Sequence, residues 1–253
     1  LKALADAIEA EYRRRGYVTA LAYLPPQRIE GGRAVIEVLE GRVGELLVEG
    51  NRYFNASRFR WYWPLETNEL LRYAAMRRSL VRMNEHPDRQ VQALLRPGRA
   101  AGTTDVVLKV SDRLPAHFGA QWDNQGTKSI GRHRAGFSAR HNNLLGLDDR
   151  AVLGTSFSLE SGAVYAQYAA PVTPYGTSAA FSFSHSRVSP KRQFRDFGVN
   201  GRSQTYGVRL EQALVDRQRV SLSGFLGLAF KESRTMVSSG TSRRDRLRVL
   251  SFG

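Results

Sequence analysis

The sequence predicts two architecturally different parts: α+β units repeated in the order β-α-α-β-β, followed by an incomplete transmembrane antiparallel β-barrel. Up to about residue 113, helical periodicity alternates with short strands, and the pattern repeats. From His117 onward the residues alternate polar and apolar with period two, and no helical period appears. No run of about 18 apolar residues occurs, so any membrane crossing is expected to use alternating strands.

The first residues predict a helix followed by two strands. Apolar side chains recur at helical spacing up to the stop signal Gly16; they are Leu1, Leu4, Ile8 and Tyr12. Residues 17–27 and 33–41 then alternate as strands do, the second with Ile36 and Val38 pointing inward. Because the chain opens at Leu1, partway through such a unit, we expect it to be a fragment or a mature segment.

The same pattern recurs further along the chain, which indicates an internal duplication. Pro25 corresponds to Pro97 at an offset of 72 residues (97 − 25 = 72), and apolar positions match at this offset through a helix and two strands. The second copy adds a strand at 44–51 and a short aromatic segment at 55–65 before its helix at about 68–84. Its last two strands are expected at 90–98 and 103–112.

Each unit is expected to pack a helix pair on a three-stranded sheet, which leaves one sheet edge and one helix groove open. An extended partner chain can add to such an edge as a further strand. The expected partner-binding residues are Val91, Ala93 and Leu95 on the strand, with Leu71, Ala75 and Arg78 on the helix face beside it. The alternative is that the unit is a plain structural spacer.

The second half predicts eight strands, each with one apolar and one polar face. Residues 177–186 are typical, because Ala179, Phe181 and Phe183 alternate with Ser182 and Ser184. Apolar side chains turned to lipid and polar ones turned to a water-filled lumen give every position a suitable solvent. A lumen lined by Arg and Ser predicts a barrel wider than eight strands. The expected pore-lining residues are Arg134, Arg140 and Arg209. A soluble sandwich or barrel with the apolar face inside remains the alternative.

Connection lengths give an independent indication of orientation. The two longest expected connections, around residues 187–203 and 231–245, are the fifth and the seventh. In an up-and-down barrel all odd connections emerge at one end, and outer-membrane barrels keep their long loops outside. The preceding units would therefore lie on the periplasmic side.

Composition excludes several classes of function. The chain has a net charge of +15 and no Cys, so it can hold neither a disulfide nor a thiolate metal site. The five His residues are scattered, and we find no nucleophile–base pair and no phosphate-binding glycine-rich loop followed by Lys. We therefore expect no enzyme activity, no metal and no cofactor. The basic charge fits acidic lipid headgroups or a positively lined pore; nucleic acid is not the expected partner.

Several stretches resemble the two-partner secretion transporters, the haemolysin secretion/activation family within the Omp85 superfamily. They are GYVTALAYLPPQRI, VIEVLEGRVGELLVEGN, VRMNEHPDRQVQALLRPGRAAGTTDVVLKVSDR, WDNQGTKSIGRHRAG and NNLLGLDD. The resemblance implies polypeptide-transport-associated (POTRA) domains in the periplasm and a 16-stranded barrel in the outer membrane of a Gram-negative bacterium. Residues 1–42 would be the C-terminal part of a first POTRA domain, 43–113 a second one, and 116–253 the N-terminal half of the barrel, about 8 of 16 strands.

The resemblance also implies a function and its partners. The POTRA domains would recognise the N-terminal secretion domain of a large exoprotein, which the monomeric barrel would export unfolded and without ATP, surrounded by outer-membrane lipid. The alternative within the superfamily is a barrel-assembly factor that inserts other outer-membrane proteins. The alternative of a different class is a soluble β-rich adhesion or nucleic-acid-binding protein.

Overall fold

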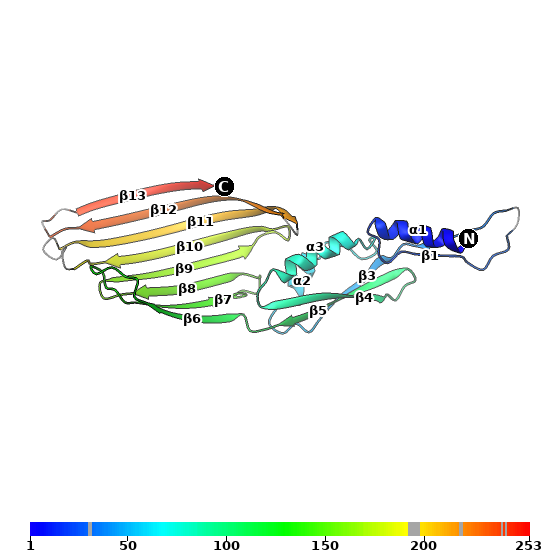
Figure 1. Ribbon diagram of the computed structural model, residues 1–253, viewed down its shortest axis with the longest axis horizontal. Coiled ribbons are helices and arrows are strands. Elements are labelled where there is room, and N and C mark those ends of the chain that lie inside the picture. The colour runs from blue at the N-terminus through cyan, green and yellow to red at the C-terminus, as the bar shows by residue number, and fades with distance from the viewer. Residues whose placement is uncertain (30–31, 192–197, 218–219, 239, 241) are drawn as a thin grey trace. The chain divides into compact units, whose positions relative to one another are not determined.

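The structure is a computed structural model of the chain, in which residues 1–29, 32–191, 198–217, 220–238, 240 and 242–253 are described. The chain divides into two compact units, Leu1–Leu114 and Pro115–Gly253. Figure 1 shows helices together with strands in the first unit and a row of neighbouring strands in the second. No helix among the described residues is long and apolar enough to cross a membrane.

The first unit begins with a helix and a two-stranded sheet. Helix α1 spans Lys2–Arg14 and is followed by Gly16, whose φ of +93° is a conformation that glycine adopts at no steric cost. Strands β1 (Leu21–Tyr23) and β2 (Glu37–Leu39) pair antiparallel. Both strands are much shorter than expected. The expected apolar stripe is also only partly buried, because Leu1 and Leu4 are exposed while Ala5 is the buried residue of α1.

The rest of the first unit has the predicted β-α-α-β-β order. Strand β3 (Arg42–Glu49) precedes α2 (Ala56–Tyr62) and α3 (Tyr73–Asn84), which are followed by β4 (Arg89–Pro97) and β5 (Thr103–Asp112). The sheet order is β3-β5-β4, with β3 parallel and β4 antiparallel to β5. Helix α2 begins at Asn55, whose side chain accepts a hydrogen bond from the Ser57 amide.

The two α+β segments share their element order but not their hairpin register. In the first hairpin Leu21 pairs with Leu39. Ala93, the counterpart of Leu21 at the 72-residue offset (93 − 21 = 72), pairs with Leu108, which corresponds to Ile36 (108 − 72 = 36). The two copies of the internal duplication therefore share the order of their helices and strands, but their hairpins differ in pairing register.

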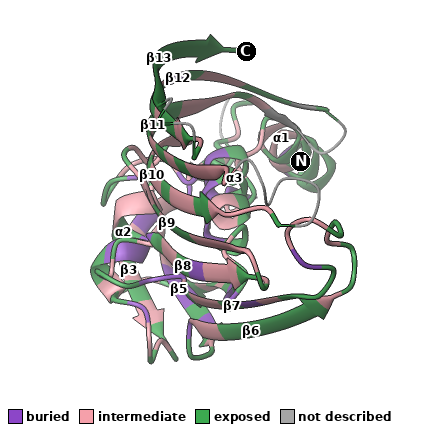
Figure 2. Ribbon diagram, turned by 90° about the vertical axis from the view of Figure 1, so that its left-hand side faces the viewer, coloured by how far each residue is buried: buried purple, intermediate pink, exposed green. Residues whose placement is uncertain are grey.

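The hydrophobic core lies in the first unit. Phe59, Leu71, Met83 and Leu108 are fully buried in it. Among the described residues, every buried hydrophobic side chain lies within residues 5–110. Figure 2 shows the same contrast, since buried segments colour the helices and strands of the first unit while the long strands are almost wholly intermediate or exposed.

The second unit is one antiparallel sheet of eight strands in chain order, from β6 to β13. The strands are β6 (Ala116–Asp123), β7 (Arg134–His141), β8 (Arg150–Phe157), β9 (Ser161–Pro171), β10 (Thr177–Val188), β11 (Asn200–Arg217), β12 (Val220–Met236) and β13 (Ser242–Phe252). The predicted up-and-down arrangement is confirmed. Strands β6 and β13 pair on one side only, so the sheet is open.

The two faces of this sheet divide as the sequence predicts. Phe181 pairs with Tyr168 and Val208, and Val208 pairs with Leu228, so one row of apolar residues shares a face across four strands. Phe181 is 46% exposed and Leu222, on the same face, is 53% exposed. No second layer packs on these side chains within the described residues.

The connections correct one expectation. The fifth connection covers residues 189–199, of which 192–197 lie outside the described residues, and the sixth turn, at 218–219, also lies outside them. The seventh connection is not long: β12 continues to Met236 and β13 begins at Ser242. The charged stretch there forms strands that extend past the apolar rows. Strand β13 places Leu250 opposite Leu228 on the apolar face.

Candidate functional site: the β4 edge, the α3 groove and the polar face of the sheet

Strand β4 is an edge strand of the three-stranded sheet and pairs with β5 alone. The opposite edge strand, β3, is partly covered by the chain before α3. The Val43 amide donates to the Glu69 carbonyl at 2.8 Å, and the Asn68 amide donates to the Val43 carbonyl at 2.7 Å. The edge of β4 is therefore the more accessible side of this sheet for an added strand.

Asn84, the last residue of α3, fixes which backbone groups of β4 point outward. Its Oδ1 accepts a hydrogen bond from the Val91 amide at 2.8 Å, and its Nδ2 donates to the Val91 carbonyl at 2.9 Å and to the Leu80 carbonyl at 2.8 Å. Val91 therefore directs both backbone groups away from β5. Because antiparallel strands alternate, Ala93 and Leu95 direct theirs to the same open side.

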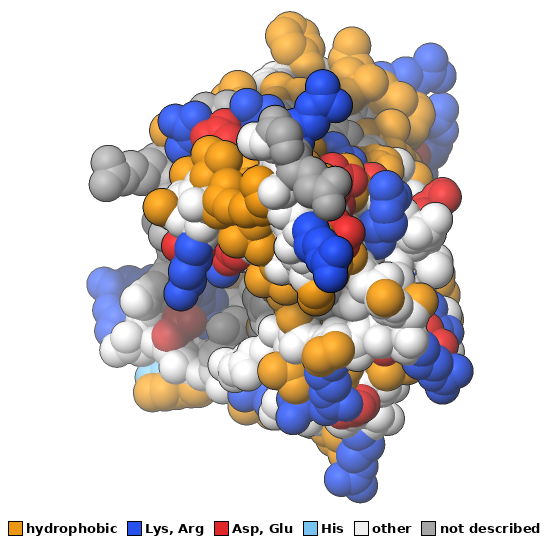
Figure 3. All heavy atoms as spheres, turned by 90° about the vertical axis from the view of Figure 1, so that its right-hand side faces the viewer, with side chains coloured by type: hydrophobic (Ala, Val, Ile, Leu, Met, Phe, Trp, Pro, Cys, Tyr) orange, Lys and Arg blue, Asp and Glu red, His pale blue; other side chains and the backbone are white. Residues whose placement is uncertain are grey.

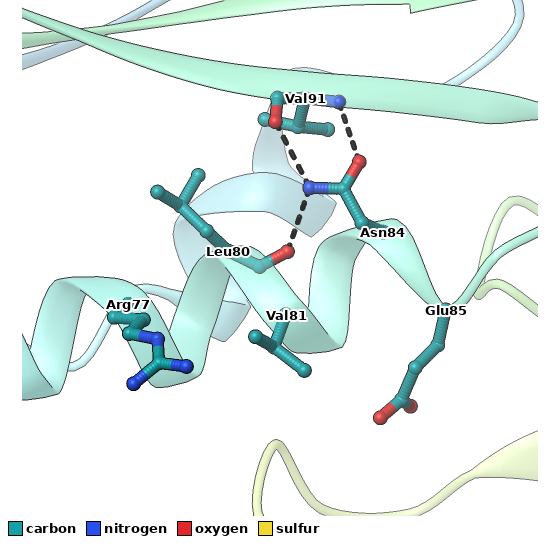
Figure 4. Close-up of a pocket in the computed structure, with 6 residues that line it drawn as sticks. All are labelled: Arg77, Leu80, Val81, Asn84, Glu85 and Val91. Atoms are coloured by element: carbon teal, nitrogen blue, oxygen red, sulfur yellow. Dashed lines mark hydrogen bonds between the residues drawn. The ribbon is translucent and has the colours of Figure 1, made fainter. Parts of the chain in front are cut away.

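A shallow groove of about 470 Å³ lies between α3 and β4. Figure 4 shows its lining: Arg77, Leu80, Val81, Asn84 and Glu85 from the helix, and Val91 from the strand. Two aliphatic side chains form its middle, and oppositely charged side chains, Arg77 and Glu85, stand on the two sides of them. Such a surface fits an apolar side chain with polar neighbours.

The structure corrects the predicted helix residues of this site. Leu71 precedes α3 and is 0% exposed, and Ala75 is 5% exposed within the core. Neither can contact a partner chain while the domain is folded. Arg78 is exposed on α3, but it is not among the residues that line the groove. Of the predicted strand residues, Val91 lines the groove, while Ala93 and Leu95 are half-buried against the core with open backbone groups.

Charged residues anchor the elements behind the edge. One carboxylate oxygen of Asp112, at the end of β5, accepts hydrogen bonds from the amides of Arg52, Tyr53 and Phe54 at 2.9, 2.8 and 3.2 Å. Arg89, at the start of β4, is buried, and its Nε donates to the Met83 carbonyl at 2.9 Å. These contacts tie β4 and β5 to the helices, so the edge is presented on a rigid support.

The three predicted pore-lining residues share the polar face of the eight-stranded sheet, Arg134 and Arg140 on β7 and Arg209 on β11. Arg140 pairs across the strands with Val152, which pairs with Gln167, and Arg209 pairs with Ala180 beside Ser182. Arg134 forms an ion pair with Asp123 on the same face, with Nε 2.8 Å from the carboxylate. Arg209 lies 3.5 Å from Glu211, and its guanidinium stacks over the ring of Phe225 at 3.8 Å.

The odd connections of the sheet contact one another at one end. The Glu160 amide donates to the Ile130 carbonyl at 3.2 Å, and the Ser189 amide donates to the Glu160 carbonyl at 2.8 Å. Lys191 and Glu160 also form an ion pair. The first, third and fifth connections are thus joined, as expected for loops at one end of an up-and-down sheet.

Some features of the site were not predicted from the sequence. Asn84, Arg77, Leu80, Val81 and Glu85 line the groove, and Phe225 supports Arg209 on the polar face. An Asn at the end of a helix, seven residues before the strand residue that it contacts, is a weak signal for such a clamp. In the described part of the chain, no group of three or more His, Asp or Glu side chains is arranged to hold a metal ion.

The surface of the first unit carries many basic side chains, as the composition predicts. Figure 3 shows one face of the molecule, on which Lys and Arg side chains are spread with hydrophobic side chains between them. In α1, Arg13 and Arg15 form ion pairs with Glu9 and Glu11. Nearby, the Tyr12 hydroxyl donates to Glu40 at 3.1 Å; this hydrogen bond raises the pKa of Tyr12, and desolvation adds to the effect.

Comparison with known proteins agrees with this architecture. Residues 102–247, more than half of the chain, match the family described as haemolysin secretion/activation protein ShlB/FhaC/HecB, and residues 1–41 match the POTRA domain of ShlB type. The outer membrane transporter CdiB of Dickeya dadantii (strain 3937) is 27% identical over 246 residues, which are 95% of this chain and 43% of that protein. The chain thus spans less than half the length of this relative.

Two solved structures show the same fold. CdiB from Escherichia coli superposes with a TM-score of 0.74 at 25% identity, covering 100% of this chain and 49% of that chain. BamA from Haemophilus ducreyi superposes with a TM-score of 0.62 at 16% identity, covering 100% and 52%, which shows a shared fold alone. The eight-stranded sheet is accordingly an incomplete outer-membrane β-barrel, and the POTRA domain at its N-terminal side is periplasmic. The chain belongs to the haemolysin secretion/activation family of two-partner secretion transporters.

Proposed function

We propose that the protein captures a large exoprotein in the periplasm and exports it through the outer membrane. The observation that carries this proposal is the open edge of β4, where Ala93 and Leu95 present unpaired backbone groups beside the groove of α3. An extended segment of the exoprotein adds to this edge as a strand. Its backbone hydrogen bonds supply affinity, and a side chain in the groove supplies selectivity.

The groove indicates which segments bind. Leu80 and Val81 form an apolar floor, with Arg77 and Glu85 as oppositely charged neighbours. A strand that alternates apolar and polar residues places every second side chain toward the helix. We therefore propose that the secretion domain of the exoprotein contributes such a strand. The barrel-assembly alternative uses similar chemistry, but the chain's family membership supports export.

The polar face of the sheet would line the conduit. Arg134, Arg140 and Arg209 share this face, and the conduit attracts carboxylates of the passing chain. Because a chain captured as an added strand is extended, the cargo passes unfolded. No nucleotide drives the passage, in keeping with the absence of a phosphate-binding glycine-rich motif from the sequence. We propose that one barrel acts as a monomer within the outer-membrane lipid.

The proposed domain organisation follows from the same features. Residues 1–42 form the C-terminal part of a first POTRA domain, 43–113 a second one, and 116–253 the N-terminal half of the barrel. The POTRA match at 1–41 and the repeated element order support the first two, and the boundary between the compact units at Leu114 supports the last.

Comparing secreted proteins with and without the gene tests the function. Deleting the gene should remove one large protein from the culture supernatant, and the full-length gene in trans should restore it. The levels of other outer-membrane proteins should stay unchanged. A general loss of assembled barrels, with no specific loss from the supernatant, would instead identify the protein as an assembly factor.

A further inference from the structure

Four arginines from neighbouring strands form a single row across β10 to β13. Arg187 pairs with Arg202, Arg202 with Arg234, and Arg234 with Arg244. Directly paired residues of adjacent antiparallel strands project from the same face and lie about 5 Å apart at their Cα atoms. We call these four residues the arginine row. Their guanidinium groups form a ribbon of positive charge across four strands.

The arginine row lies on the apolar face of the sheet, beyond its hydrophobic band. Along β10 the face runs Phe181, Phe183, His185 and Arg187, two residues at a time. Phe183, Tyr206 and Phe230 pair across three strands and form an aromatic line at the end of the band. Aromatic residues in this position mark the membrane–water interface of outer-membrane barrels.

The spacing places the arginine row at headgroup level. Leu222 and Phe230 are eight residues apart on β12 (230 − 222 = 8). This separation gives about 20 Å of height, at about 3.3 Å per residue and about 40° of tilt. Arg234 lies four residues beyond Phe230 (234 − 230 = 4), which adds about 10 Å. The row therefore stands just outside the hydrocarbon, where phosphate groups of lipids reside.

The chain direction puts this level in the outer leaflet. The periplasmic POTRA unit precedes β6, so β6 starts at the periplasmic end and every odd connection lies at the outer end. The arginine row adjoins the fifth and seventh connections, since β10 ends at Val188 and β13 begins at Ser242. It faces lipid rather than the conduit, so cargo inside the barrel does not reach it.

The row lacks enough acid to balance its charge. Among the described residues of this face on the four strands, from the level of His185 to the outer end, Glu232 is the one acidic residue. Glu232 lies 2.6 Å from Arg244, 3.7 Å from Arg234 and 3.5 Å from Arg246. One carboxylate thus serves three guanidinium groups, and Arg187 and Arg202 stand next to them. Like charges directly opposite one another in a sheet are destabilising, so binding an external anion would stabilise this end of the sheet.

We propose that the arginine row binds the phosphate groups of lipopolysaccharide in the outer leaflet. Guanidinium groups bind phosphate bidentately, and several in a line match a lipid headgroup that carries more than one phosphate. The acyl chains of the same lipid then pack against the apolar band below. The site depends on the outer-membrane location and not on cargo recognition, so it can be tested without secretion.

The test uses the purified full-length protein in detergent, freed of lipid, with its thermal unfolding followed during lipid titration. The probes are rough lipopolysaccharide, the same lipid after chemical removal of its phosphates, and inorganic phosphate. The test variant changes all four arginines of the row to Gln. A matched control changes four exposed arginines of the first unit to Gln: Arg28, Arg33, Arg60 and Arg99.

We expect the wild type to bind the dephosphorylated lipid at least tenfold more weakly than lipopolysaccharide, a difference of about 1.4 kcal/mol in binding free energy. The row variant should bind intact lipopolysaccharide more weakly by the same factor. The lipopolysaccharide affinity of the control variant should stay within about twofold of the wild-type affinity. Without lipid, the row variant should unfold at the same or a higher temperature than the wild type, because repulsion is relieved. With bound lipopolysaccharide, the row variant should unfold at a lower temperature than the wild type.

Three results would overturn the proposal. Equal affinity for the dephosphorylated lipid excludes phosphate recognition. Full stabilisation by inorganic phosphate at the same phosphate concentration assigns the row to small anions rather than lipid. An equal loss in the matched control assigns the effect to total charge. If the row variant does not fold, the pair R202Q/R234Q and the four-residue Arg→Lys variant replace it; both should bind more weakly than the wild type, and unchanged binding contradicts the proposal.

Discussion

Replacing Ala93 with proline separates strand addition from folding. The Val91 contacts of Asn84 show that the odd-numbered residues of β4 turn their backbone groups away from β5. Proline at Ala93 therefore removes an outward amide and leaves the β4–β5 ladder intact. The same change at Gln92, which pairs with Lys109 within the ladder, removes an inward amide instead. The two substitutions are one position apart along the strand, but Ala93→Pro affects an added partner strand and Gln92→Pro affects the pairing with β5.

The magnitudes differ accordingly. At Ala93 an added strand loses one hydrogen bond and keeps one buried carbonyl without a donor, which together cost about 2 to 4 kcal/mol of binding free energy. This corresponds to about 30- to 1,000-fold weaker binding. The free energy of unfolding of the domain should change by about 1 kcal/mol or less, because edge strands tolerate proline. Gln92→Pro should instead reduce the free energy of unfolding by about 3 kcal/mol or more.

Secretion by the full-length protein is the assay, with the amount of exoprotein in the supernatant measured at equal transporter levels. Ala93→Pro should abolish most secretion, while Ala93→Val, which keeps the amide, should secrete normally. Hydrogen exchange across residues 89–97 confirms that the strand remains formed. Normal secretion by Ala93→Pro, with the strand intact and the transporter correctly assembled, would refute capture at this edge.

Three further predictions follow from the same structure. Asn84→Ala should reduce the stability of β4 by about 1 to 3 kcal/mol, because three hydrogen bonds are lost; unchanged amide exchange across the strand contradicts this. Phe181→Arg should reduce the yield of assembled barrel by a cost of about 1 to 2 kcal/mol, because Phe181 lies between the aromatic line and the midplane, whereas the adjacent Ser182→Arg should assemble normally; equal yields would contradict our assignment of the faces. The hydrogen bond to Glu40 raises the pKa of Tyr12, so its stabilisation is complete below about pH 10 and lost as pH rises through the raised value. The hydrogen bond to Glu37 raises the pKa of Tyr23 as well, so an ultraviolet titration should lose one tyrosine from its late-ionising component in Tyr12→Phe and keep the rest. A late component that is unchanged in Tyr12→Phe would contradict the contact.

The sequence alone predicts the parts of the fold that depend on local periodicity. The alternation of Phe181 and Ser182 defines two faces because a strand turns over at every residue, whatever surrounds it. The β-α-α-β-β order is likewise readable from the change of period. The seventh connection was predicted wrongly because the charged residues 231–245 look like a loop, although the strands continue there beyond the membrane.

The site depends more on tertiary contacts and was predicted less well. Ala75 shares a helical face with Met76, Ser79 and Met83, and that face meets the core rather than the groove. The apolar residues of a short helix define only approximately which side of the helix faces the core. An error of one or two residues in that assignment exchanges buried and exposed positions of α3. Leu71 was placed on the helix because the start of α3 was expected too early. Asn84 was missed because its role depends on a contact with Val91 that local sequence does not specify.

If the exoprotein adds to the β4 edge as we propose, the clamp that Asn84 places on Val91 also limits how long the added strand stays bound. Pro97 has no amide to offer, so the landing site is reduced to Ala93 and Leu95, bounded at both ends. Four hydrogen bonds of about 0.5 to 1.5 kcal/mol each allow brief occupancy and rapid exchange. Weak binding of this kind suits stepwise export, in which successive segments of the exoprotein bind to the β4 edge, dissociate and move on. Tight binding at this edge would slow the entry of the exoprotein into the barrel.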